Sequence, residues 1–196
     1  MPRKPRQLVD GGIYHIISRG NNRTDVFKVE GGFQWFIELL RSSKLKYPWK
    51  IFHYCLMSNH FHILGQVATG SDLPKIMQYL LTHYSRWYQY HVSYEGHLWS
   101  GRYKSPLIDR ESYLLECARY IERNPLRAGL ASSPEDYPWS SYRYYAFGKQ
   151  DALVDEDPGY LPTFGYHISE RQENYRNFVK IPTIGASLQP ASYLAP

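Results

Sequence analysis

The chain has 196 residues, of which 43% are hydrophobic, so it is long enough to bury a sizeable core and too apolar to be a disordered protein. Its formal net charge of +5 and its pI near 9.1 favour an acidic partner such as nucleic acid. Two cysteines exclude a disulfide framework. No apolar run reaches membrane length and the first residues, MPRKPRQ, lack a signal-peptide core, so we expect a cytoplasmic protein with no membrane partner.

Periodicity predicts the elements in the order strand, helix, strand, strand, helix, strand, helix. The predicted strands cover residues 13–20, 49–57, 60–67 and 102–108. The predicted helices cover residues 33–45, 73–92 and 111–124. Pro125 ends the last helix, because the residue before a proline avoids helical angles. Few parallel crossovers suggest themselves, so we expect an α+β fold with an antiparallel β-sheet flanked by α-helices.

Composition divides the chain into three parts. Residues 1–12 form a basic arm that is broken by prolines. Residues 13–148 hold all the predicted strands and helices and form the main domain. Residues 149–196 contain many Pro and Gly, so we predict a loop-rich C-terminal tail that wraps the domain or is partly disordered.

Two histidines lie one residue apart in the otherwise apolar stretch YCLMSNHFHILGQV, directly after a turn at Ser58 and Asn59. Side chains along a strand alternate between its faces, so His60 and His62 point the same way with Cα atoms roughly 6–7 Å apart. Two imidazoles on one face can hold one metal ion. For the pair alone, two hydrogen-bonded histidines at the start of a strand are the more frequent explanation.

The helix predicted over residues 111–124 carries a second candidate group. Tyr120 and Asn124 are one turn apart and therefore share a face. A tyrosine oxygen can act as a covalent nucleophile, and a carboxamide oxygen is a hard metal ligand. Because the chain has 19 tyrosines, one tyrosine beside an asparagine is ordinary, and this spacing alone does not establish catalysis.

Five separated motifs point to one family when they are taken together. They are YHIISRGNN, YCLMSNHFHIL, HLWSGRYKS, YIERNPLRAGL and DYPWSSY, and they follow one another over about residues 10–145. In this order they resemble the single-tyrosine transposases with a His-hydrophobic-His motif, in particular the REP-associated tyrosine transposases of bacteria. The family commonly has a proline where this chain has Ser58, which is a difference in the loop and leaves the two histidines unchanged.

The resemblance implies a ferredoxin-like or RRM-like HUH nuclease fold for residues 13–148, which agrees with the predicted sheet and helices. It implies that His60 and His62 bind a divalent metal, Mg²⁺ with Mn²⁺ as a substitute, together with a third ligand from the tyrosine helix. Related transposases have Gln four residues after the tyrosine, where this chain has the shorter Asn124. Glu122 is the weaker candidate for the third ligand, because it lies two residues from Tyr120 and should face elsewhere.

The activity that the resemblance implies is cleavage and rejoining of DNA. Tyr120 attacks a phosphodiester, releases a 3′-hydroxyl and forms a 5′-phosphotyrosine intermediate that another 3′-hydroxyl resolves. The substrate is single-stranded DNA that carries a hairpin, the REP element. Candidates for contacts to phosphates or bases are basic or carry an amide: Arg3, Lys4, Arg6, Arg19, Asn21, Asn22, Arg23, Arg102 and Lys104. Each of them is equally well explained as a solvated surface residue.

Two other functions stay open at this point. A domesticated relative would grip hairpin DNA without cutting it, although the intact His60, His62 and Tyr120 argue against this. A zinc hydrolase would use water as its nucleophile, would require a third His, Cys or carboxylate ligand and would give Tyr120 no role. Trp99 and Trp139 could stack on bases, but core packing explains both better. The sequence does not fix the oligomeric state, and a monomer is favoured.

Overall fold

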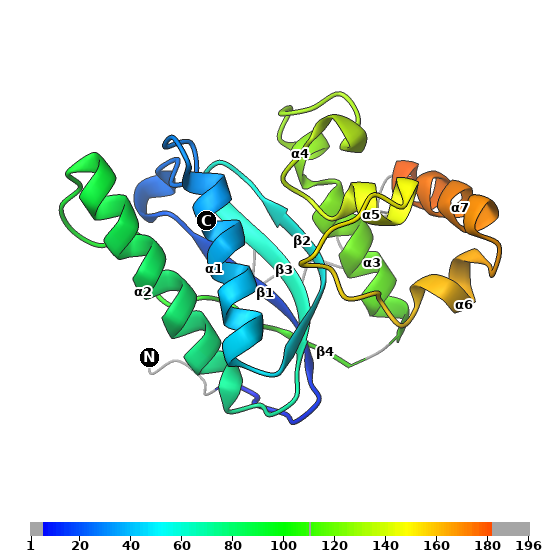
Figure 1. Cartoon of the computed structure of the whole chain (residues 1–196), viewed down its shortest axis with the longest axis horizontal. Coiled ribbons are helices and arrows are strands. Elements are labelled where there is room, and N and C mark those ends of the chain that lie inside the picture. Colours follow the sequence, from blue (N-terminus) through cyan, green and yellow to red (C-terminus); the bar gives the residue numbers. More distant parts are fainter. Residues whose placement is uncertain (1–5, 110, 182–196) are drawn as a thin grey trace.

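The computed structural model of the chain describes residues 6–109 and 111–181. Arg3 and Lys4 of the predicted basic arm, and residues 182–196 of the predicted tail, lie outside the described residues. The described residues fold around one β-sheet with helices on both of its faces (Figure 1). None of the helices in these two ranges is long and apolar enough to cross a membrane.

The sheet is antiparallel and has the strand order β2-β3-β1-β4. Its strands are β1 (Ile13–Arg19), β2 (Trp49–Leu56), β3 (His60–Val67) and β4 (Leu107–Ile108). The two central strands, β1 and β3, are buried on both faces, as expected for strands that are covered from both sides. The predicted α+β fold with an antiparallel sheet is therefore confirmed.

The last predicted strand is much shorter than the sequence pattern indicated. We expected a strand over residues 102–108, but only β4 pairs with β1 as a ladder, and Lys104 makes an isolated bridge with Ile17. Pro106 lies between the two contacts and has no N–H to donate, so it interrupts the ladder.

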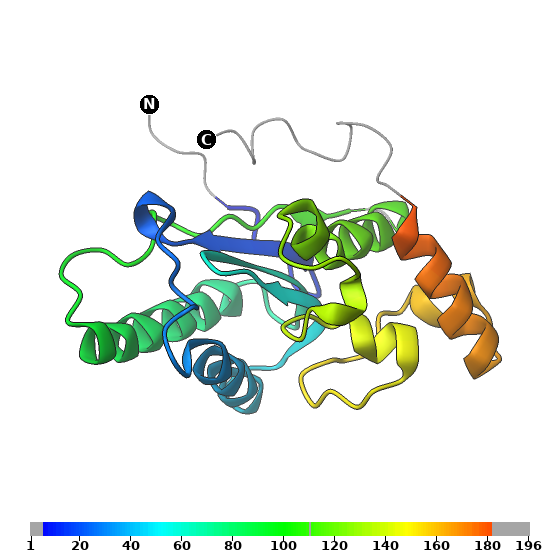
Figure 2. The same ribbon diagram turned by 90° about the horizontal axis from the view of Figure 1, so that it is seen from above.

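Two long helices, α1 (Gly32–Lys46) and α2 (Asp72–Val92), lie side by side on one face of the sheet (Figures 1 and 2). Phe36 of α1 packs on both Tyr84 of α2 and Phe61 of β3. The buried hydroxyl of Tyr84 donates to the Val26 carbonyl at 2.7 Å, so it is hydrogen-bonded. Burying each large apolar side chain contributes roughly 1.5–3 kcal/mol, and this face holds the largest group of buried residues.

The other face of the sheet is covered by α3 (Glu111–Glu122), and four further helices pack around and beyond it (Figure 1). These are α4 (Asn124–Arg127), α5 (Tyr142–Phe147), α6 (Tyr160–Phe164) and α7 (Ile168–Lys180). The 3₁₀ helices η1 (Asn21–Arg23) and η2 (Pro134–Asp136) lie in the connections. The predicted helix over 111–124 is broken at Arg123, and Pro125 stands in the first turn of α4, where a missing N–H costs nothing.

Residues 149–181 do not form the loop-rich segment that we expected from their composition. They contain α6 and α7, which pack on each other, and α7 also packs on α5. Phe164, Tyr175 and Val179 are buried in a cluster with residues of α5. The cluster crosses position 148, so these helices share a core with the preceding segment. The burial of these aromatic side chains stabilises helices in a segment whose Pro and Gly content favours loops.

Candidate active site

His60 and His62 lie on the face of the sheet that α3 covers. Their ring centroids are 5.0 Å apart, with the ring planes at 85°. His62 is buried, and His60 is half-buried at the start of β3. The structure thus brings the two histidines together on one face, as the period-two pattern predicted.

One nitrogen of each ring is held by a neighbouring side chain. Nδ1 of His62 lies 2.9 Å from Nε2 of His15 on β1, and Nδ1 of His60 lies 2.6 Å from Oδ1 of Asn59. When each Nδ1 donates, each Nε2 keeps its lone pair, which is the arrangement that metal-binding histidines adopt. Within the described ranges neither Nε2 makes a hydrogen bond. This set of donors therefore fits a divalent metal ion.

The surroundings keep all three histidines neutral near pH 7. Burial lowers the pKa of His15 to about 4, and burial with the nearby charge of Arg19 lowers the pKa of His60 to about 4. Burial is also the main cause that holds the pKa of His62 well below its ordinary value of 6.5. Neutral imidazole is the form that binds a metal, so the electrostatics favour ligation.

His15 and Asn59 belong to the site although no motif in the sequence pointed to them as functional residues. His15 is a polar residue inside the apolar stretch IYHIIS, which was a usable signal. Its neighbour across the sheet could not be named, however, until the antiparallel register placed Ile17 opposite His62.

Tyr120 projects from α3 toward these histidines. Its ring centroid lies 5.6 Å from that of His62 and 6.0 Å from that of His15, with the rings edge to face. Burial raises the pKa of the Tyr120 hydroxyl, and the charge of Arg127 opposes that rise. The predicted nucleophile therefore lies beside one of the predicted metal ligands.

Asn124 is buried in the first turn of α4. Its Nδ2 donates to the carbonyl of Tyr120 at 2.8 Å and to that of Ile121 at 3.3 Å, which fixes the amide against the end of α3. Its Oδ1 makes no hydrogen bond in the part of the chain that the structure describes. Ligation of a metal by that oxygen stays a prediction.

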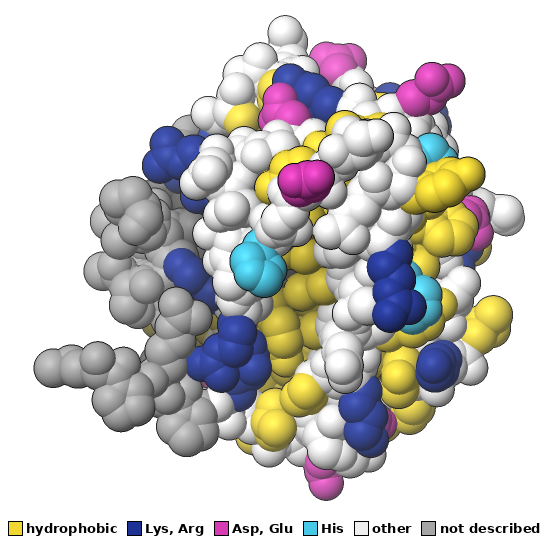
Figure 3. Space-filling model, turned by 90° about the vertical axis from the view of Figure 1, so that its left-hand side faces the viewer, with side chains coloured by type: hydrophobic (Ala, Val, Ile, Leu, Met, Phe, Trp, Pro, Cys, Tyr) yellow, Lys and Arg dark blue, Asp and Glu magenta, His cyan; other side chains and the backbone are white. Residues whose placement is uncertain are grey.

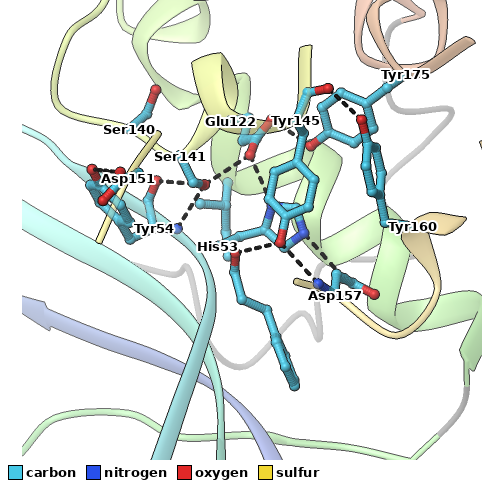
Figure 4. Close-up of polar contacts among 12 residues, drawn as sticks. His53, Tyr54, Glu122, Ser140, Ser141, Tyr145, Asp151, Asp157, Tyr160 and Tyr175 are labelled. Atoms are coloured by element: carbon cyan, nitrogen blue, oxygen red, sulfur yellow. Dashed lines mark hydrogen bonds and ion pairs between the residues drawn. The ribbon is translucent and has the colours of Figure 1, made fainter. Parts of the chain in front are cut away.

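Glu122, the weaker candidate for the third ligand, points into a buried polar network (Figure 4). Its Oε1 accepts hydrogen bonds from Nδ1 of His53 and from Oγ of Ser141, both at 2.8 Å. Its Oε2 accepts from the hydroxyl of Tyr175 at 2.5 Å. Both carboxylate oxygens are committed to these partners, so Glu122 is not available to a metal at the histidine pair.

His53 is a buried cation between two carboxylates in that network (Figure 4). Its Nδ1 lies 2.8 Å from Glu122 and its Nε2 lies 3.1 Å from Oδ2 of Asp157. Burial acts to lower the pKa of His53, but the hydrogen bonds and charges of Asp157 and Glu122 raise it to about 9. The ring of Tyr145 stacks on it at 4.2 Å. The network thereby ties the helix that carries Tyr120 to β2 and to the segment before α6.

Six of the predicted DNA-binding residues gather at the end of the sheet where His60 lies. Arg19 ends β1 opposite His60, and η1 follows directly. Backbone hydrogen bonds hold residues 98–104 alongside β1 and η1. The residues that this arrangement brings to one edge are Arg19, Asn21, Asn22, Arg23, Arg102 and Lys104.

The neighbouring surface is hollowed. Figure 3 shows a depression with hydrophobic side chains at its floor and Lys and Arg side chains around it. A cavity of about 550 Å³ lies between α2 and residues 96–101, and Asn21 and Trp99 contribute to its lining. Apolar and aromatic surface beside basic residues is the combination that holds bases and phosphates.

Three other candidates make contacts within the fold. The guanidinium of Arg6 lies 3.8 Å from the ring centroid of Tyr103 and donates to its carbonyl at 3.0 Å. Trp99 is buried in the main core. Trp139 packs against the same core and stacks on Phe33 at 4.7 Å. Core packing of both tryptophans, the explanation that we favoured, is confirmed.

The zinc hydrolase alternative requires a third His, Cys or carboxylate at the histidine pair. Across residues 6–109 and 111–181, no group of three or more such side chains could hold a metal ion. His15 is a third histidine beside the pair, but its Nε2 makes a hydrogen bond with Nδ1 of His62. The alternative therefore lacks its ligand set in this part of the chain.

The chain is similar to known proteins over most of its length. The family model of the IS200-like transposases matches residues 9–124. A Haemophilus influenzae protein that is named as a REP-associated tyrosine transposase is 25% identical over 151 residues, which cover 70% of this chain and 83% of that protein.

Two solved structures are similar as well. One, described as a REP-associated tyrosine transposase bound to a REP hairpin, has a TM-score of 0.64 and 18% identity over 80% of this chain and 93% of its own, so the two share a fold. A second, described as a transposase from Deinococcus radiodurans, has a TM-score of 0.44 and 20% identity over 62% of this chain and 97% of its own.

These findings confirm the resemblance that the five motifs indicated. The matched stretch is more than half of the chain and contains His60, His62 and Tyr120. The chain therefore belongs to the IS200-like transposase family.

Proposed function

We propose that the chain is a metal-dependent endonuclease and strand transferase that acts on single-stranded DNA through Tyr120. The observation that carries the proposal is the convergence of Tyr120 and His62, whose rings lie 5.6 Å apart although they come from α3 and β3. A nucleophile beside two neutral imidazoles with free Nε2 atoms is suited to attack on a metal-bound phosphodiester.

His60 and His62 would hold the metal through Nε2, with Mg²⁺ as the proposed ion and Mn²⁺ as its substitute. Asn124 is the proposed third ligand. Magnesium prefers oxygen ligands, so a pair of histidines favours tighter binding of Mn²⁺. When bound, the metal would neutralise charge on a non-bridging phosphate oxygen.

The nucleophilic step uses the hydroxyl of Tyr120. Its oxygen forms a bond to phosphorus, the bond from phosphorus to the 3′ oxygen breaks, and the strand leaves with a 3′-hydroxyl. The 5′-phosphotyrosine that results is resolved when another 3′-hydroxyl attacks it. Each step exchanges one phosphoester bond for another, so the reaction needs no ATP.

Hairpin-containing DNA of the REP type is the proposed substrate. The solved relative with the same fold is described as bound to a REP hairpin. The candidate DNA-binding residues along β1, η1 and residues 98–104 lie at the same end of the sheet as His60. Together, these two observations favour a single strand that runs along this edge toward Tyr120.

Replacing Tyr120 with Phe tests the proposal, because it removes the attacking oxygen and keeps the ring. Labelled single-stranded hairpin DNA is incubated with Mn²⁺ and protein, and denaturing gels reveal any covalent adduct. Wild type should form an adduct that maps to Tyr120, and Tyr120→Phe should form none. Tyr113→Phe, on the same helix, is the matched control and should behave as wild type.

The outcomes also separate the alternatives. A hairpin-binding protein that does not cut would bind DNA and give no adduct in either form. A hydrolase that uses water would keep cutting as Tyr120→Phe. An adduct on a different tyrosine would keep the reaction class and overturn the assignment of Tyr120.

A further inference from the structure

Three arginines follow one another at four-residue spacing along α3 and α4, and they differ in their partners. Arg119 pairs with Glu116. Arg123 donates to the carbonyl of Val179 at 2.6 Å. Arg127 is exposed, and no carboxylate among the described residues lies within ion-pair distance of it. Of the three, Arg127 is therefore the one with neither a carboxylate nor a backbone carbonyl as the partner of its guanidinium among the described residues.

That charge lies at the predicted nucleophile. The guanidinium carbon of Arg127 is 5.0 Å from the ring centroid of Tyr120. Arg123, between α3 and α4, keeps right-handed helical angles, so Arg127 lies about 10 Å along the helical path from Tyr120, at about 1.5 Å per residue. A long side chain closes this gap because helical side chains point back toward the N-terminus. The exposed end of α4 thus places a cation over the ring of Tyr120.

The sheet brings a second arginine to the same site. Arg19 ends β1 and lies opposite His60 in the register of β1 and β3. The ring of Tyr120 lies 5.6 Å from that of His62, which is two residues after His60 on β3. Arg127 and Arg19 therefore come from different elements to the place where a phosphate would meet Tyr120.

We propose that Arg127 is a charge-stabilising residue of the cleavage reaction, which holds its guanidinium over Tyr120 and binds a non-bridging oxygen of the scissile phosphate. The inference rests on the proposed function. As the bond from the Tyr120 oxygen to phosphorus forms and the bond to the 3′ oxygen breaks, the fixed guanidinium stabilises the charge on the phosphate oxygens. Arginine stays protonated, so solvent takes the tyrosine proton and supplies the proton of the 3′-hydroxyl.

The test compares Arg127→Ala and Arg127→Lys with wild type and with Arg86→Ala, all as full-length protein. Arg86 is exposed on α2, which covers the opposite face of the sheet, so its replacement controls for the loss of one surface charge. The probe is labelled single-stranded hairpin DNA with Mn²⁺. Fluorescence anisotropy measures binding, denaturing gels measure the rate of adduct formation at saturating DNA, and thermal melting checks the fold.

Arg127→Ala should form the adduct about 100-fold more slowly, with a melting temperature like that of wild type and hairpin affinity changed only a few-fold. Arg127→Lys should keep part of the rate, because lysine supplies charge without the planar fork. Guanidinium ions at low concentration should partly restore Arg127→Ala, and sodium at equal ionic strength should not. Arg86→Ala should match wild type.

Two results would overturn the assignment while the proposed function stands. The first is an Arg127→Ala protein that forms the adduct as fast as wild type, or that slows only as far as its weaker DNA binding explains. The second is an Arg127→Lys protein as slow as Arg127→Ala, together with no rescue by guanidinium. Failure of wild type to form any adduct would instead overturn the proposed function, and the role of Arg127 with it.

Discussion

The cation at His53 allows a quantitative test of how the tyrosine helix is held. His53→Gln keeps a side chain of similar length and removes the positive charge between Glu122 and Asp157. Both carboxylates are fully buried or nearly so, at 0% and 1% exposure. Loss of the cation leaves them without their charged donor, and an uncompensated buried charge is strongly destabilising.

The shift in the pKa of His53 gives the size of the expected loss of stability. Burial alone would lower this pKa, whereas Asp157 and Glu122 raise it from 6.5 to about 9. At about 1.4 kcal/mol per pH unit, that difference corresponds to about 3 kcal/mol. Because the folded-state pKa lies above the unfolded one, this stabilisation is complete below pH 6.5 and is lost as the pH rises through about 9.

Urea unfolding checks both consequences. At pH 6.5 the His53→Gln protein should be less stable than wild type by about 3 kcal/mol, and the stability of wild type should fall between pH 6.5 and about 9. His83→Gln is the control, since His83 is exposed on α2 and should change neither quantity. A His53→Gln protein as stable as wild type at pH 6.5, or a wild-type stability that stays flat over this range, would refute the buried cation.

Two further predictions concern the metal. His15→Ala removes the partner of Nδ1 of His62, so the affinity for Mn²⁺, measured by titration, should fall by about 10–100-fold; an unchanged affinity would show that His15 does not orient His62. Asn124→Ala should raise the Mn²⁺ concentration that cleavage requires, and Asn124→Gln should keep activity. If Asn124→Ala needs no more Mn²⁺ than wild type, the third ligand lies elsewhere.

The parts of the fold that the sequence predicted are those with a strong period. β3 begins and ends at the predicted residues, His60 and Val67, and α2 covers Asp72–Val92 where the pattern indicated 73–92. The strand predicted over residues 102–108 is shorter than its pattern indicated. Pro106 has no N–H to donate, and in a short edge strand the loss of one ladder hydrogen bond is enough to interrupt the pairing. The helices α6 and α7 form because their aromatic rings are buried against α5. That contact is tertiary, so the local composition of residues 149–181 does not predict it.

In the candidate site, too, local spacing predicted some positions, whereas contacts between distant parts of the chain could not be predicted. Alternation placed His60 and His62 on one face, and helical spacing indicated that Glu122 faces away from Tyr120. Arg127 lies beyond Pro125, where the predicted helix ended, so the pattern did not place it beside Tyr120; α4 continues the helical path to Arg127. By contrast, His53 and Asp157 are 104 residues apart, so no local pattern could reveal their contact.

The contacts of Glu122 explain why the tyrosine helix needs the rest of the chain. The family model ends at residue 124, yet Ser141 and Tyr175, which lie beyond it, donate to the Glu122 carboxylate. Asp157, also beyond it, holds the opposite side of His53. A fully buried carboxylate without such partners would cost several kcal/mol. The position of Tyr120, two residues before Glu122 on the same helix, therefore depends on donors from α7 and from the residue that precedes α5, although neither contacts the histidine pair.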